Sequence, residues 1–66
     1  MLTHEYYINL ENITGRVTIG YDGAEAVWEA YDFFCNEVAG TDVKVCLWDG
    51  STGEVLAYNW EDEEEA

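Results

Sequence analysis

A single stretch of helical periodicity, with strand-like segments on both sides, constrains the fold of this sequence more than any other feature. Asp22 and Glu25 have the spacing of a capping box, and Gly40 is suited to end a helix. Between them, apolar residues recur on one helical face: Ala24, Val27, Trp28, Tyr31, Phe34, Cys35 and Val38. The pattern predicts a helix over about residues 23–39.

Two β-hairpins are predicted to flank this helix. Strand-forming residues occupy four segments, 5–10, 16–21, 42–48 and 54–60. Polar turns at 12–15 and 49–53 separate them in pairs, and Gly15 is able to adopt the positive φ that such turns use. The sequence therefore predicts an α+β fold of order β-β-α-β-β, in which a four-stranded antiparallel sheet has one helix packed on one face.

Such a sheet has one covered face and one open face. We expect Trp28, Tyr31 and Phe34 to be the central helix contacts on the covered face. Alternation turns another set of side chains to the open face: Tyr7, Asn9, Arg16, Thr18, Lys44, Cys46 and Trp48. The last strand has two possible rows for the covered face: Leu56, Tyr58 and Trp60, or Val55, Ala57 and Asn59.

Charge is the dominant feature of the composition. Fifteen acidic residues stand against two basic ones, Arg16 and Lys44, and the formal net charge is −13. We expect residues 1–60 to form one domain and the acidic tail, 61–66, to be disordered. A chain this acidic repels nucleic acid and anionic membranes, so a basic protein is its expected partner. Solubility alone is the alternative explanation of the charge.

The polar face of the predicted helix supplies candidate partner-binding residues. Glu25, Glu29 and Asp32 follow one another at i, i+4 and i+7. Their Cβ atoms should lie about 5–6 Å apart, a spacing compatible with that of phosphates along a nucleic-acid strand. Further acidic candidates surround the helix and its connections: Asp22, Glu37, Asp42 and Asp49. The alternative is an ordinary solvated helix face, which is commonly charged.

The open sheet face supplies a second candidate surface. Its aromatic candidates are Trp48, Tyr7, Tyr58 and Trp60. Exposed tryptophan and tyrosine are frequent anchors of protein interfaces. The alternatives are a homodimer that packs two open faces together, or aromatic pairs between neighbouring strands.

No residue pattern indicates catalysis, so we expect a protein that is not an enzyme and uses no metal or cofactor. His4 is expected to be solvated and without a partner. Cys35 and Cys46 lack the spacing of a zinc or redox motif. No signal peptide or membrane-length apolar run is recognisable, so the cytoplasm of a bacterial host is the expected compartment.

In overall character, the chain resembles the small acidic DNA-mimic inhibitors of phages and mobile elements. These include anti-restriction and anti-CRISPR proteins and the uracil-glycosylase inhibitor. The resemblance rests on small size, one-sided charge and the carboxylate row formed by Glu25, Glu29 and Asp32. It implies an inhibitor that occupies the basic nucleic-acid site of a host defence or repair protein, such as a nuclease. The alternative function is a small interaction or scaffold domain that binds through the aromatic sheet face.

Overall fold

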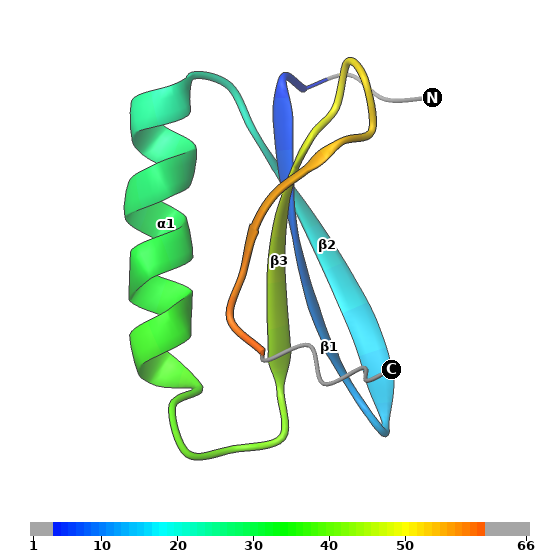
Figure 1. Ribbon diagram of the computed structural model, residues 1–66, viewed down its shortest axis with the longest axis vertical. Helices are drawn as coiled ribbons and strands as arrows, with labels where there is room; N and C mark the ends of the chain where they lie inside the picture. Colours follow the sequence, from blue (N-terminus) through cyan, green and yellow to red (C-terminus); the bar gives the residue numbers. More distant parts are fainter. Residues whose placement is uncertain (1–3, 61–66) are drawn as a thin grey trace, which may run out of the picture.

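The computed structural model describes residues 4–60 and confirms the predicted α+β fold. Strands β1 (Tyr6–Asn12) and β2 (Gly15–Tyr21) precede helix α1 (Ala24–Glu37), and strands β3 (Lys44–Asp49) and β4 (Val55–Tyr58) follow it. The four strands form one antiparallel sheet of order β2-β1-β3-β4, with α1 lying against one face (Figure 1). The tail that we predict to be disordered, 61–66, lies outside the described residues.

Strand pairing decides which side chains face the helix. Ile8 of β1 is paired with Ile19 of β2 and with Leu47 of β3, and Leu10 is paired with Val45. Cross-strand partners share a face of the sheet, so this apolar set lies on the helix side. The core is small: Ile8, Val27, Val45 and Leu47 are fully buried.

The predicted helix contacts are only partly confirmed. Tyr31 and Phe34 pack against the core, but Trp28 is 43% exposed, so its predicted central position is wrong. Successive helical residues are about 100° apart, and Trp28 is therefore turned well away from Val27, which points into the core. Its ring instead packs edge-on against Tyr31, with 5.7 Å between the ring centroids.

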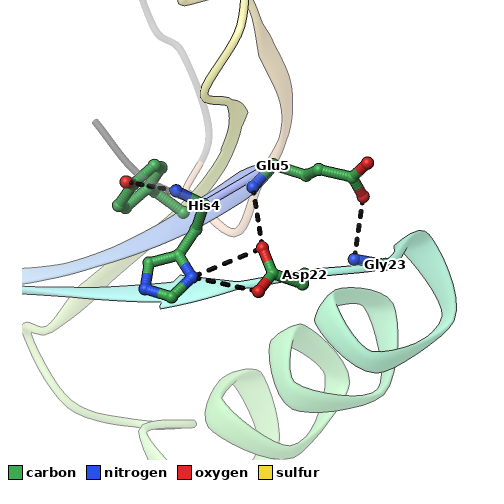
Figure 2. A network of polar contacts seen from close by, with 5 residues as sticks. His4, Glu5, Asp22 and Gly23 are labelled. Carbon is green, nitrogen blue, oxygen red and sulfur yellow. Dashed lines mark hydrogen bonds and ion pairs between the residues drawn. The ribbon is translucent and has the colours of Figure 1, made fainter.

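The start of the helix also differs from the prediction. The N-cap residue is Gly23, with φ of 98°, and no side chain caps the helix. The Asp22 carboxylate instead accepts a hydrogen bond from Glu5 N at 3.2 Å and lies 3.3 Å from His4 Nδ1 (Figure 2). Glu5 Oε1 in turn accepts from Gly23 N at 3.0 Å. The predicted capping box is therefore wrong, because Asp22 ties the end of β2 to the start of β1.

Both predicted turns are present, although the first has a different mechanism. Asn12 Oδ1 accepts hydrogen bonds from Thr14 N, Thr14 Oγ1 and Gly15 N at 2.9, 2.8 and 3.2 Å. Because the Asn12 side chain closes this turn, Gly15 simply begins β2 and does not have the positive φ that we predicted. In the second turn Gly53 does have positive φ, 79°, and its N–H donates to Asp49 O at 2.7 Å.

Candidate functional site

The acidic helix face, defined here as Glu25, Glu29 and Asp32, lies on the solvent side of α1. All three side chains are exposed, whereas Val27 on the opposite side of the helix is fully buried. Glu37 is exposed in the last turn of the same helix. The helix contains no lysine or arginine, so all the charged groups on its outer surface are carboxylates.

The charges of α1 are not arranged to stabilise the helix throughout. Glu25 lies in the first turn, where a negative charge interacts favourably with the helix dipole. Glu37 lies in the last turn, which has no basic residue, and there the same dipole disfavours a negative charge. Glu25 and Glu29 also form a like-charge pair at i, i+4. Each unfavourable placement costs a few tenths of a kcal/mol, roughly 0.2–1 kcal/mol.

The other acidic candidates do not join the acidic helix face. The Asp22 carboxylate contacts the His4 ring and accepts a hydrogen bond from Glu5 N. Asp49 is half-buried at the end of β3, where its Oδ1 accepts a hydrogen bond from Ser51 N at 2.7 Å. Asp42 is exposed in the connection between α1 and β3. Thus two of the acidic residues that we predict to bind a partner, Asp22 and Asp49, instead make hydrogen bonds that stabilise turns and strand ends.

Two exposed aromatic side chains accompany the carboxylates on α1. Trp28 is 43% exposed and Phe33 is 56% exposed. At 100° per residue, Trp28 lies on one side of the Glu29 position and Phe33 on the other. Our sequence reasoning missed both as surface residues, because it placed Trp28 in the core and did not consider Phe33. Phe33 is about 120° from Val27 around the helix, and this angle is the sequence signal that could have identified it as a surface residue.

The chain's two cations lie on the other side of the sheet. Glu11 of β1 is paired with Arg16 of β2 and with Lys44 of β3, so the three side chains share the open face. Lys44 Nζ lies 5.7 Å from the centroid of the Trp60 ring, within the range of a cation–π contact. Charge is therefore segregated: every charged residue of α1 is acidic, whereas both basic residues lie on the open face beside Glu11.

The open-face aromatic residues differ in their exposure. Tyr7 is 7% exposed, so the prediction that it is a surface residue is wrong. Its ring stacks on half-buried Trp48, with centroids 4.9 Å apart, and its hydroxyl accepts a hydrogen bond from His4 N at 2.9 Å. His4 reaches this position because Gly20 has no side chain, and a Cβ there would collide with the imidazole ring. His4 is exposed, as expected, but the expectation that it has no partner is wrong, because its Nδ1 lies 3.3 Å from the Asp22 carboxylate.

Tyr58 at the end of β4 and Trp60 just beyond it form a second aromatic pair on the open face. Tyr58 is opposite Cys46 and is 47% exposed, whereas Ala57 packs against the core. Thus Ala57 faces the helix and Tyr58 faces the open side, whereas a register shift places Val55 opposite Trp48. The Tyr58 and Trp60 rings are stacked, with centroids 4.8 Å apart and planes inclined by 28°.

Two titratable groups among residues 4–60, Cys46 and Tyr31, have a clearly shifted pKa. Burial raises the pKa of the Cys46 thiol, which makes the reactive thiolate scarcer at neutral pH. Burial, followed by a hydrogen bond with Cys35, raises the pKa of Tyr31. Within residues 4–60 there is no group of three histidine, cysteine or acidic side chains placed to hold a metal ion, and no helix long and apolar enough to cross a bilayer.

Comparison with known proteins adds no family to these observations. No protein-family model matches the chain, and comparisons with curated sequences and with solved structures give no significant match.

Proposed function

We propose that this protein is a phage-type inhibitor that binds the basic nucleic-acid site of a host defence or repair protein by mimicking DNA. The supporting observation is the segregation of charge. Helix α1 presents four carboxylates to solvent and no cation, while Arg16 and Lys44 are both on the opposite side of the sheet. A basic partner is therefore attracted to the helix layer and not to the open face.

The unfavourable charge placements within α1 support the same proposal. A helix face shaped by stability alone would intersperse lysine or arginine with its acids, as i, i+4 pairs do in many helices. Here the Glu25–Glu29 repulsion and the carboxylate of Glu37 at the C-terminal end have no such compensation. The row is instead compatible with a partner that supplies the cations. Its negative charge would both speed encounter and compete with DNA for lysine and arginine side chains.

Trp28 and Phe33 would supply contacts that charge alone does not. Interfaces are anchored by a few well-packed side chains, with aromatic residues prominent among them, whereas rim charges mainly affect the association rate. Both rings border the acidic helix face and are accessible. In this proposal the carboxylates attract and orient the partner, and the two rings pack against it.

A second function is favoured by the Tyr58–Trp60 stack. Tyr58 is half-exposed on the open face, beside the cation–π contact of Lys44 with Trp60. A protein-interaction or scaffold domain would use this pair as its anchor, and the acidity would then serve solubility. Trp48 is a weaker anchor than our sequence reasoning supposed, because it is half-buried against Tyr7.

Displacement of DNA from purified nucleic-acid enzymes tests the proposed function. The probes are restriction endonucleases, CRISPR effector nucleases and a uracil-DNA glycosylase, each bound to its own fluorescent DNA and followed by anisotropy. The test variant reverses the acidic helix face, with Glu25, Glu29 and Asp32 changed to Lys. Its matched control reverses three acids outside the helix, Asp42, Glu54 and Glu63, and leaves Glu11 unchanged because Glu11 lies between Arg16 and Lys44 on the open face. Both variants have the same net charge, −13 + 6 = −7.

The parent and the control variant should displace DNA from the same enzyme with affinities within about threefold of one another. The helix-face variant should be weaker by roughly 100-fold, as expected if three charge pairs each contribute about 1 kcal/mol. Equal losses in the two variants would show that net charge matters and the helix face does not. If the parent displaces DNA from none of these enzymes, it does not mimic their substrates.

A further inference from the structure

The two edges of the sheet differ in how well they are protected. Edge strand β4 has four residues and a register shift at Leu47/Trp48, two devices that discourage further strand pairing. Edge strand β2 has seven residues and pairs with β1 at every position without a shift. The chain contains no proline that could interrupt it. Long, regular edges of this kind are templates for pairing with another strand.

The outer part of β2 is also uncovered. Helix α1 packs on β1 and β3, and Figure 1 shows β2 at the side of the sheet farthest from the helix. Val17, which belongs to the helix-side face, is consequently 55% exposed, and Arg16 and Thr18 beside it are exposed. The strand therefore offers both unpaired backbone groups and an apolar side chain.

The charge of β2 indicates which partner fits it. It contains Arg16 and no acidic residue, so its net charge is +1. Every other element is neutral or negative: β1 has Glu11, α1 has four acids, β3 has one charge of each sign, and β4 has none. This edge is where two copies of so acidic a chain repel one another least.

We propose that two copies of this chain associate through their β2 strands, antiparallel and around a two-fold axis at Thr18. In this register Thr18 meets Thr18 of the second copy, and Val17 lies opposite Ile19 of the second copy on the helix-side face. Arg16 lies opposite Gly20 of the second copy and is a diagonal neighbour of Asp22. Diagonal Cα atoms are about 7–8 Å apart, within reach of an arginine side chain. Each copy thus brings its β2 cation to a carboxylate of the other.

The resulting assembly is a continuous eight-stranded sheet. Because Val17 and Ile19 lie on the helix side in both copies, both helices lie on the same side of that sheet. Each helix lies over β1 and β3, so about four strand spacings, roughly 19 Å, separate the two helices. The association buries neither acidic helix face, and it stands independently of the proposed inhibitor function.

Sedimentation equilibrium of the full chain tests this dimer. The 7.5 kDa chain should approach twice its mass as concentration rises, and association should tighten at least threefold between 50 and 500 mM NaCl, because salt screens the repulsion between two acidic chains. Val17→Lys should weaken association at least tenfold. Val55→Lys is the matched control: Val55 is 50% exposed on the other edge, and this variant should associate as the parent does. Circular dichroism should show both variants folded.

Cross-linking distinguishes this register from other dimers. Residues on the two-fold axis lie within disulfide range, so Thr18→Cys should form a covalent dimer under mild oxidation while the parent does not. A monomer at every concentration and salt would overturn the proposal. So would a dimer that resists Val17→Lys, or one in which Thr18→Cys fails to cross-link; such results would place the interface on the open face or on β4. The expected salt dependence is opposite in sign to that of binding a basic partner, so failure of one proposal is distinguishable from failure of the other.

Discussion

Two leucine-to-alanine substitutions should have very different effects on stability. Leu47 of β3 is fully buried and belongs to the core cluster with Ile8, Val27 and Val45. Leu56 of β4 is 41% exposed. The two changes remove the same atoms from neighbouring strands, so any difference in the free energy of unfolding reports the environment of each side chain.

The expected magnitudes follow from burial. Truncating a fully buried leucine removes its transfer free energy and leaves a cavity, which together cost about 2.7–5 kcal/mol in well-packed cores. Leu56 leaves no enclosed cavity and has lost only part of its contact with water, so about 1 kcal/mol is expected for Leu56→Ala. A domain of this size has a total stability of roughly 3–10 kcal/mol. Leu47→Ala should therefore remove about a quarter of the stability or more.

Urea denaturation followed by far-UV circular dichroism measures both variants. With a slope near 1 kcal/mol/M, typical of a small domain, Leu47→Ala should lower the midpoint by about 3 M or leave the chain unfolded in buffer. Leu56→Ala should lower it by about 1 M. Equal midpoints for the two variants, or a larger effect of Leu56→Ala, would show that the core does not lie between α1 and the β1–β3 pair.

Further substitutions test single contacts. Asn12→Ala removes the acceptor of three hydrogen bonds in the first turn and should cost about 1–2 kcal/mol, whereas Asn36→Ala on the exposed side of α1 should be neutral or slightly stabilising, as thermal melts can show. Because the pKa of Tyr31 is raised in the folded state, the unfolded chain ionises first, and the parent should lose stability as pH rises above about 10. Melts of Tyr31→Phe between pH 9 and about 11 should show a smaller loss, and a loss equal to that of the parent would contradict this role.

Local patterns predicted the elements of this fold well and their arrangement less well. Helical spacing of apolar residues predicted α1, and alternation of apolar and polar residues predicted all four strands. Both patterns arise because an element that is buried on one face has apolar side chains at regular intervals. The strand order β2-β1-β3-β4 was not predicted, since alternation does not specify which strands are neighbours. Nor does it reveal that Gly23 turns the chain with positive φ and so directs the Asp22 carboxylate away from the helix.

The candidate site was predicted in part for the same reason. The exposure of Glu25, Glu29 and Asp32 follows from helical spacing alone, and the structure confirms it. The burial of Tyr7 depends on His4, which reaches across to Gly20 from outside the strands, and no periodic pattern encodes such a contact. Trp28 is apolar and lies at the border of the helical stripe, about 100° from Val27, and spacing alone does not decide whether a border residue is buried.

The salt dependence of partner binding tests the central proposal most directly. The affinity for an enzyme identified by DNA displacement should be measured from 50 to 500 mM NaCl for the parent, the helix-face variant and its matched control. The parent and the control should lose affinity steeply with added salt, while the helix-face variant, with Glu25, Glu29 and Asp32 changed to Lys, should bind weakly with a shallow dependence. A parent affinity that is unchanged over this range, together with loss of binding in Tyr58→Ala, would contradict DNA mimicry and place the binding site on the open face of the sheet.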